Sequence, residues 1–141
     1  HNFHLAVIES GRTDALLTFS DYNLLRQSAG DALLPRAADA DLGVINGWSI
    51  MRGWLTGVPV ETFVPEKHWG EDHQRAERMR LWCTEHEIDL LQLALHYCLR
   101  DERIHGNPIG SLNLNQLERN VKAVMQGPDN QVFAEFARAQ L

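Results

Sequence analysis

The sequence has no long run of apolar side chains, and this absence excludes a transmembrane helix, because a membrane span needs roughly 20 such residues in succession. Positive charge is also scarce: 13 Lys and Arg stand against 19 Asp and Glu, giving a formal net charge of −6. No stripe of Lys and Arg runs through the chain, so we do not expect nucleic acid as its main partner. Repeats and low-complexity tracts are absent as well, and the 44% hydrophobic content is typical of a globular chain.

Cysteine occurs only twice, at Cys83 and Cys98, and both positions fall within helical patterns. Their spacing is not that of a metal-binding pair, so we expect two buried free thiols in a reducing cytoplasm. No secretory signal opens the sequence, and its first residue is His1 rather than Met, which we interpret as a processed or shortened start. The predicted location is therefore cytoplasmic.

Seven histidines raise the question of a metal site. His68 and His73 lie among acidic residues, but they are five positions apart and cannot share one face of a helix. We therefore predict no metal site.

At 141 residues the chain has the length of one domain. Apolar periodicity predicts helices at 4–10, 28–39, 73–86, 90–100, 114–124 and from 131 onward, and strands at 15–19, 42–46 and 103–108. This alternation indicates a βα series on a parallel sheet, with strands buried on both faces. Three strands, with at most a further strand end at His1 and Asn2, make an incomplete sheet, so the chain is expected to be part of a larger fold.

The stretch 104–120 carries the clearest local signal. A short apolar strand leads to Gly110 and Ser111, and Asn113 then caps a helix in which Gln116 occupies the capping-box position. A strand end, a glycine and a free helix N-terminus bring several N–H groups together, which favours an anion such as phosphate. An ordinary strand-to-helix loop that binds nothing is the alternative. Apolar residues in the helix recur at a spacing of three and four and predict one buried face: Leu114, Leu117, Val121 and Val124.

Four segments, taken in order, resemble the C-terminal half of an aldo-keto reductase, a (βα)8 barrel. They are HNF at 1–3, FSDYN at 19–23, VINGWSIMRGWLTG at 44–57, and the block from 90 to 120. Among the branches of that family, the sequence is most similar to D-threo-aldose (L-fucose or galactose) dehydrogenases. The resemblance implies that 1–141 is a single partial domain, comprising about strands six to eight of the barrel with their helices.

The resemblance also implies which residues hold a dinucleotide. Asn2 matches the residue that binds the nicotinamide carboxamide, and Trp48 lies at or next to the position that stacks on the nicotinamide ring. The other matching positions follow the pyrophosphate, the adenosine-side phosphate and the adenosine: Ser49, Met51, Gly53, Gly110, Ser111, Gln116 and Asn120. Phe19 replaces a glutamine that also contacts the carboxamide. For the tryptophans, including Trp54 and Trp69, the alternative is a packing role in the barrel mouth.

NAD is the expected cofactor, with NADP less favoured. Relatives that use NADP place a lysine and an arginine where this sequence has Gly110 and Gln116, and neither residue can pair with the additional phosphate. Arg119 is one helical step from Gln116 and would reach that phosphate only by turning back.

The family's catalytic Asp, Tyr, Lys and His lie on strands two to four, which the resemblance does not include. We therefore assign no catalytic residue, and neither Tyr22 nor Tyr97 has a lysine that the family pattern places beside it. Two hypotheses follow. The chain is the cofactor-binding half of an aldose or aldehyde oxidoreductase, acting on small sugars or aldehydes when the other half is supplied. Alternatively, it is a non-catalytic half-barrel that binds nucleotides or self-assembles, or a truncated gene product.

A half-barrel leaves the inner face of its sheet uncovered. We assign that face to Leu16, Thr18, Val44, Asn46 and Ile104, and expect a second copy to cover it in a homodimer or other oligomer.

Overall fold

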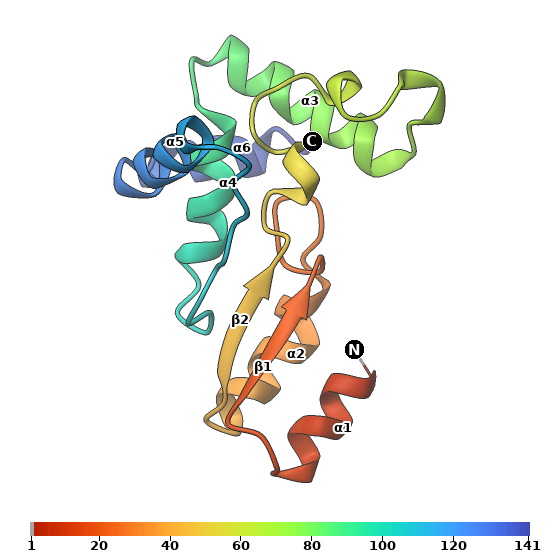
Figure 1. The fold of residues 1–141 in the computed structure, drawn as a ribbon, viewed down its shortest axis with the longest axis vertical. Helices are drawn as coiled ribbons and strands as arrows, with labels where there is room; N and C mark the ends of the chain where they lie inside the picture. The colour runs from red at the N-terminus through yellow and green to blue at the C-terminus, as the bar shows by residue number, and fades with distance from the viewer. Residues whose placement is uncertain (1) are drawn as a thin grey trace. The chain divides into compact units, whose positions relative to one another are not determined.

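The computed structural model describes residues 2–141, which form two compact units (Figure 1). Of the described residues, unit 1 comprises 2–49 and Cys98–Ile109, and unit 2 comprises Ile50–Tyr97 and Gly110–Leu141. The elements in chain order are α1 (Asn2–Ser10), β1 (Ala15–Phe19), α2 (Ser28–Asp39), β2 (Gly43–Gly47), the short 3-10 turns η1 (Met51–Gly53), η2 (Val60–Thr62) and η3 (Glu66–His68), α3 (Glu71–Glu85), α4 (Leu90–Leu99), α5 (Leu114–Met125) and α6 (Asn130–Arg138).

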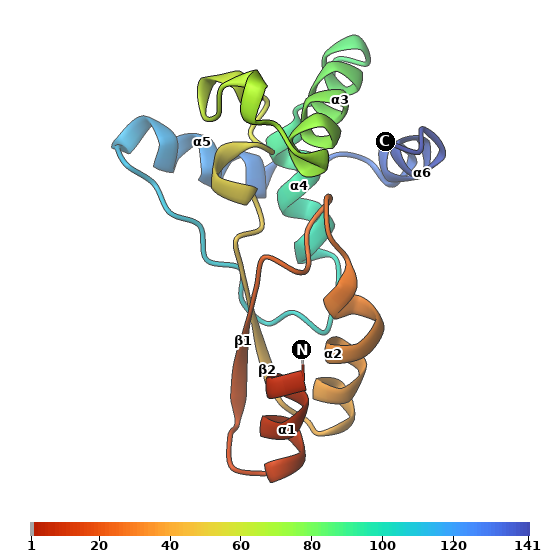
Figure 2. The ribbon, with the colours of Figure 1, turned by 90° about the vertical axis from the view of Figure 1, so that its right-hand side faces the viewer.

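The sheet of unit 1 consists of β1 and β2, which pair in parallel from Ala15 opposite Gly43 to Phe19 opposite Gly47. Helices α1 and α2 lie on the same side of the two strands (Figure 2). The helix predicted at 28–39 is confirmed as α2, because its residues Ala29, Leu33 and Leu34 recur on one face and are buried.

The strands are buried on one face only, so the prediction of burial on both faces is wrong. Along β1, Leu16 and Thr18 are buried, whereas Leu17 and Phe19 are about half exposed. In β2, Val44 and Asn46 are buried and Ile45 is exposed. Because side chains alternate along a strand, the assignment of the uncovered face to Leu16, Thr18, Val44 and Asn46 was displaced by one residue.

The uncovered sheet face therefore consists of Leu17, Phe19 and Ile45. Ile104, which was also assigned to it, is partly buried outside both strands.

A third strand at 103–108 is not formed. The segment makes a single parallel bridge, in which Gly106 lies opposite Ile45. The N–H of His105 donates to the carbonyl of Val44 at 2.8 Å, and the N–H of Asn46 donates to the carbonyl of Gly106 at 2.8 Å. Pro108 has no N–H with which to continue the ladder. The described sheet is accordingly two-stranded rather than three- or four-stranded, while its parallel direction is confirmed.

The first helix replaces the strand end expected at the start of the chain. Asn2 and Phe3 belong to α1, and both are exposed. His1 lies outside the described residues.

In unit 2, the helix predicted at 90–100 is confirmed as α4, and it is buried. Asp89 caps this helix, its Oδ1 accepting a hydrogen bond from the N–H of Leu91 at 2.8 Å. Apolar side chains on nearly every side of the helix are buried: Leu90, Leu91, Leu93, Ala94 and Leu95. Helix α3 contributes Ala76, Met79 and Cys83 to the buried residues.

Helix α5 differs from its prediction. Leu114, Leu117, Val121 and Val124 were expected to be buried, yet their exposed fractions lie between 37% and 65%. The buried residues of α5 are Asn120 and Ala123, on another side of the helix. The helix predicted from the apolar period is therefore confirmed, but no described residue covers its apolar face.

The other end of α5 is fixed by His96, whose Nε2 lies 2.9 Å from the carbonyl oxygen of Val124 and 3.2 Å from that of Ala123. These carbonyls belong to the last turn of the helix and have no partner within it. In α6, Phe136 packs edge-to-face on Trp82 with ring centroids 5.5 Å apart. Three apolar residues of α6 are half-buried: Val132, Phe133 and Phe136.

Cys83 and Cys98 are free and buried, as predicted. Burial raises the pKa of each thiol to about 12, with a smaller contribution from the nearby carboxylates. Among residues 2–141, none of the helices combines the length and apolar character needed to cross a membrane.

Candidate functional site

In unit 1, the segment that follows β2 presents an aromatic ring. Trp48 is half-buried and has a backbone φ of 65°, in the left-handed region that residues other than glycine rarely adopt. Its ring lies against Phe19, with centroids 4.6 Å apart and the planes tilted by 44°. Since β1 and β2 are parallel, these two aromatic residues mark the carboxyl ends of adjacent strands, where α/β proteins commonly bind ligands.

A network of three side chains, Asn46, Asn107 and Ser49, lies directly beside Trp48. The Nδ2 of Asn46 donates to the carbonyl of Tyr22 at 2.9 Å and to the Oδ1 of Asn107 at 3.1 Å. The Nδ2 of Asn107 in turn donates to the Oγ of Ser49 at 3.1 Å. Asn46 and Ser49 are fully buried. The sequence analysis missed Asn107, and its one signal was an amide side chain inside an apolar strand-like segment.

Asn2, the third predicted residue of unit 1, is exposed in the first turn of α1. Within the described part of the chain, no hydrogen bond or ring contact joins Asn2 to Trp48 or to Ser49. Of the three described residues predicted for unit 1, Trp48 and Ser49 are neighbours in the chain, and Asn2 contacts neither of them.

In unit 2, Met51 and Gly53 form the turn η1. Met51 is buried with a φ of 47°, and Gly53 has a φ of 100°. A Cβ added at Gly53 would lie 2.8 Å from the ring of Phe63, so this turn requires glycine for both its conformation and its packing.

Gly110, Ser111, Gln116 and Asn120 gather at the start of α5. Asn113 caps the helix, its Oδ1 accepting from the N–H of Gln116 at 3.0 Å, as predicted. Gln116 closes the cap in a variant of the capping box, because its Oε1 accepts from the N–H of Leu112 at 2.8 Å.

The loop before α5 is tied to the helix by a second contact. The Nδ2 of Asn120 donates to the Oγ of Ser111 at 3.0 Å. Gly110 is exposed, and an added Cβ would meet no atom within 4 Å. The N–H groups of Leu114 and Asn115 donate to no described residue. The helix start therefore presents unpaired donors beside an open glycine and a hydroxyl, an arrangement that suits an anion.

Arg119 is held on a different side of the helix. Its guanidinium donates to the carbonyl of Thr56 at 2.6 Å and lies 3.8 Å from the carboxylate of Asp89. These contacts direct the cation away from Gln116, beside which the sequence analysis considered it as a phosphate ligand.

Tyr22 is buried and is bound to a carboxylate in unit 1. Its hydroxyl donates to Asp101 at 2.6 Å, and Asp101 also accepts from Nε and the terminal nitrogen of Arg103 at 2.8 and 2.7 Å. The Arg103 guanidinium, followed by the Tyr22 hydroxyl, lowers the pKa of Asp101 to about 2. The hydroxyl proton of Tyr22 is thus directed to Asp101.

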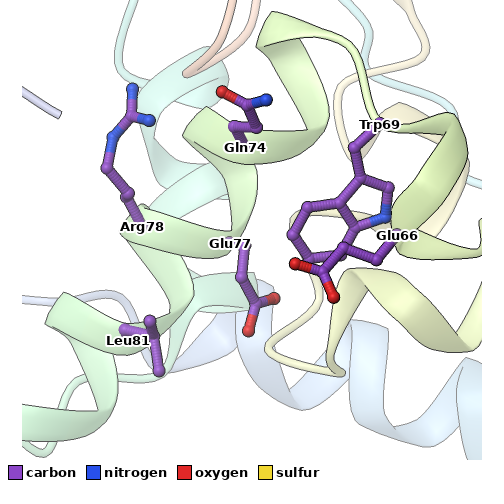
Figure 3. A pocket seen from close by; sticks show the side chains of 6 residues that line it. All are labelled: Glu66, Trp69, Gln74, Glu77, Arg78 and Leu81. Carbon is purple, nitrogen blue, oxygen red and sulfur yellow. The ribbon is translucent and has the colours of Figure 1, made fainter.

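A hollow of about 370 Å³ lies in unit 2 between η3 and α3 (Figure 3). Glu66 and Trp69 line one side and residues of α3 line the other; the α3 residues are Gln74, Glu77, Arg78 and Leu81. None of the residues predicted for cofactor binding lines it.

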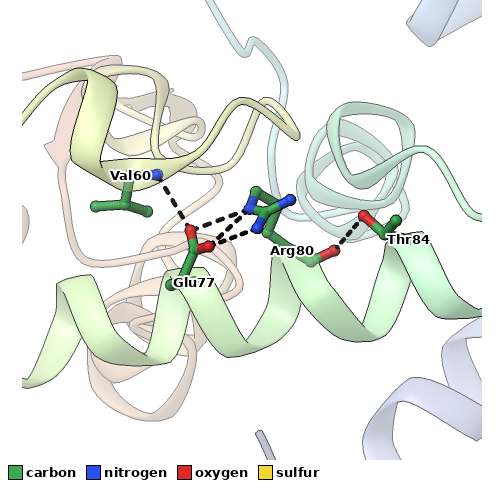
Figure 4. Close-up of polar contacts among 4 residues, drawn as sticks. All are labelled: Val60, Glu77, Arg80 and Thr84. Atoms are coloured by element: carbon green, nitrogen blue, oxygen red, sulfur yellow. Dashed lines mark hydrogen bonds and ion pairs between the residues drawn. The ribbon is translucent and has the colours of Figure 1, made fainter.

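One of the two carboxylates that line this hollow, Glu77, has structural partners. Glu77 accepts from the N–H of Val60 at 3.1 Å and from Arg80 at 2.6 to 3.0 Å (Figure 4). The hydrogen bond from Arg80 lowers the pKa of Glu77. Glu77 thus joins η2 to α3 and is not free to act on a ligand.

His73 lies in the first turn of α3 and bonds to the residue that precedes the helix. Its Nδ1 accepts from the N–H of Gly70 at 3.0 Å, and its ring lies 4.1 Å from that of Trp54. In the described part of the chain, no group of three His, Cys, Asp or Glu side chains is placed to hold a metal ion.

Comparisons with known proteins place this geometry in a family. A sequence model described as "Aldo/keto reductase family" matches residues 4–139, nearly the whole chain. Among curated protein sequences, none matches.

A solved structure that resembles the chain is aldo-keto reductase AKR11C1 from Bacillus halodurans in its holo form, with a TM-score of 0.69 and 20% sequence identity. The match covers 96% of this chain but 46% of the Bacillus chain, so this chain spans about half of that protein's length. The predicted fold class, an α/β fragment of a (βα)8 barrel, is confirmed.

Proposed function

Since the chain belongs to the aldo/keto reductase family, we propose that it is the cofactor-binding, C-terminal half of an NAD(P)-dependent oxidoreductase. The bound dinucleotide supplies the hydride chemistry, and the proposed substrates are small sugars or aldehydes, as for aldose dehydrogenases. The chain spans about half of the structure that it resembles, so a complete enzyme needs residues beyond those described here.

The observation that carries this proposal is the start of α5. Gly110 leaves room for a phosphate to approach the backbone, and Ser111 presents a hydroxyl oriented by Asn120. The N–H groups of Leu114 and Asn115 complete a set of neutral donors at the positive end of the helix dipole. These residues fit a dinucleotide phosphate in charge and in space, and Gln116 and Asn120 extend the same site toward the adenosine.

We assign the nicotinamide end of the cofactor to Asn2 and Trp48, and the pyrophosphate to Ser49, Met51 and Gly53. Trp48 offers a half-buried ring face for stacking. Buried Ser49 and Met51 offer backbone rather than side-chain contacts, since the hydroxyl of Ser49 already accepts from Asn107.

We propose NAD rather than NADP. Gly110 and Gln116 carry no charge, and the nearest cation in sequence, Arg119, is bound to Thr56 and faces Asp89. An additional phosphate on the ribose would therefore lack the charge-assisted hydrogen bonds that normally hold it.

The chain contributes no catalytic residue in this proposal. Reduction of a carbonyl requires an acid that protonates its oxygen, and Tyr22 is bound to Asp101. The proposed acid and its tuning lysine belong to the missing half, so the isolated chain holds a cofactor without turning over substrate.

A titration of the chain with NADH and NADPH, followed by tryptophan fluorescence, tests the proposal. We expect NADH to bind, and Gly110→Val to weaken binding about 10-fold, because its side chain fills the space left by the glycine. Glu66→Gln, in the hollow of unit 2, is the matched control and should bind as the unaltered chain does. Absence of binding for both cofactors, or an equal effect of the two variants, would reject the phosphate site.

A second candidate function is self-assembly. The sheet face formed by Leu17, Phe19 and Ile45 is apolar and open in unit 1, and soluble chains rarely leave such a face uncovered. We propose a homodimer in the cytoplasm, where the two free thiols stay reduced. Light scattering at low micromolar concentration should show twice the mass of the chain, and Leu17→Lys should return it to one chain mass.

A further inference from the structure

The backbone at Trp48 is held in a conformation that the residue does not favour. Trp48 has a φ of 65°, and the next residue, Ser49, is fully buried with its side chain turned inward. A tryptophan in the left-handed region persists only where its surroundings impose that conformation. The Phe19 ring supports the Trp48 side chain, but a ring contact does not fix the backbone that follows.

Asn107 constrains the residue that follows Trp48. One end of its amide accepts from Asn46 and the other end donates to the Oγ of Ser49, both at 3.1 Å. Asn46 is itself fixed at the end of β2 by its bond to the carbonyl of Tyr22 and by the backbone bond from its N–H to Gly106. Asn107 therefore connects β2, through Asn46, to Ser49, the residue immediately after Trp48.

We propose that Asn107 is a positioning residue that fixes Ser49 and thereby orients the Trp48 ring for the nicotinamide. The inference rests on the proposed function for the role of that ring, whereas the ordering of Trp48 by Asn107 stands independently of any ligand. Asn107 does not itself contact the cofactor in this assignment.

The amide group is suited to this task because it provides an acceptor and a donor from one rigid plane. Leucine has a similar size but offers neither, and it would leave a buried N–H of Asn46 and the hydroxyl of Ser49 without partners. Aspartate keeps the acceptor for Asn46, and its second oxygen can accept a hydrogen bond from the Ser49 hydroxyl, which is free to rotate. The two substitutions therefore separate the hydrogen bonds from the shape of the side chain.

The test uses the whole chain labelled with fluorinated tryptophan, in which Trp48 is assigned from the spectrum of Trp48→Phe. In the ligand-free protein, Asn107→Leu and Ser49→Ala should shift and broaden the Trp48 fluorine resonance, and Asn107→Asp should restore it. NADH dissociation constants should rise about 10-fold for the first two variants and return to within about 3-fold for Asn107→Asp. The double variant Asn107→Leu, Ser49→Ala should be no weaker than either single variant, because both changes break the same connection.

Tyr22→Phe is the matched control. It removes the hydrogen bond to Asp101 in the same unit but leaves the main-chain carbonyl that Asn46 uses. We expect Tyr22→Phe to lower stability without altering the Trp48 resonance or NADH binding. A Trp48 resonance that is unchanged in Asn107→Leu, or changed as strongly in Tyr22→Phe, would overturn the inference.

Two further outcomes remain distinguishable. If Asn107→Leu does not fold, Ser49→Ala decides by the same two measurements, since it removes the same hydrogen bond with a smaller change. If the unaltered chain binds neither NADH nor NADPH, the proposed function fails. The fluorine resonance would then still decide whether Asn107 orders Trp48.

Discussion

Replacing Asp101 by asparagine should destabilise unit 1 in a manner that depends on pH. Asp101 accepts hydrogen bonds from the Tyr22 hydroxyl and from two nitrogens of Arg103, and its side chain is only 11% exposed. Arg103 also donates to the carbonyl of Gly30, so the carboxylate anchors a cation that connects the segment after α4 to α2. An asparagine at this position would direct an NH2 group or a weaker acceptor at those donors.

The magnitude follows from the pKa of Asp101, which folding lowers from 3.8 to about 2. One pKa unit corresponds to about 1.4 kcal/mol, so the ionised carboxylate contributes about 2 kcal/mol to the free energy of unfolding at pH 7. A lowered pKa means that the folded state binds the proton less readily than the unfolded state. The contribution is therefore complete above pH 4 to 5, and it is lost as the pH falls toward 2.

Urea unfolding followed by circular dichroism at pH 7 and pH 3 measures this difference. Asp101→Asn should lower the free energy of unfolding by about 2 kcal/mol at pH 7 and by about half as much at pH 3. Asp39→Asn, at the exposed end of α2, should stay within about 0.5 kcal/mol at both values. An Asp101→Asn loss as large at pH 3 as at pH 7 would show that the charge of the carboxylate is not the source of the stability.

Three further outcomes are expected. Gln116→Arg should improve NADPH binding by about 1–2 kcal/mol in fluorescence titrations, and no change would mean that this position does not face the ribose. Gly127→Ala should lower the free energy of unfolding by about 1–2 kcal/mol, because its Cβ would displace the His96 ring from the last turn of α5; Gly110→Ala, which meets no atom, is the control. With thiol pKa values of about 12, Cys83 and Cys98 should resist iodoacetamide at pH 8 until urea unfolds the chain; rapid alkylation of the native protein would contradict their burial.

The helices were predictable because their periodicity is strong and their ends carry local signals. The bounds of α2 follow from Ala29, Leu33, Leu34 and Ala37, four buried positions at helical spacing. The cap of α5 follows from Asn113, whose side chain bonds within one turn. Signals of this kind depend on residues three or four positions apart, so they can be recognised without knowledge of the tertiary contacts.

The sheet was less predictable because its decisive contacts are distant in sequence. ALLTF is apolar at four of its five positions, so the pattern alone does not show whether the odd or the even positions are buried. In the structure Leu16 is buried and Leu17 is half exposed. The segment from 103 to 108 makes a single β-bridge, at Gly106, and the next residue, Asn107, forms a side-chain hydrogen bond to Ser49 instead. This hydrogen bond joins residues that are 58 positions apart in the sequence.

The candidate site shows the same difference between local and distant contacts. The arrangement at Gly110 and Ser111 is local, and the sequence analysis located it. The contacts of Trp48 with Phe19 and of Ser49 with Asn107 join different elements and were missed. Sequence similarity to a family assigned Trp48 a role but could not show what holds the ring. Residues that touch a ligand tend to stand near recognisable turns, while the residues that position them are identified only by their contacts.

The exposed face of α5 shows what an apolar period does and does not establish. Leu114, Leu117 and Val121 follow helical spacing as regularly as the buried residues of α2 do, yet each is at least 49% exposed. The helix is fixed through a different side, where Ala123 and Asn120 are buried and His96 binds its last turn. Periodicity therefore identifies a surface whose burial would be favourable, but it does not show that the covering residues belong to the same stretch of chain. The chain spans about half of the structure that it resembles, and this uncovered face of α5 is a surface on which further contacts would be favourable.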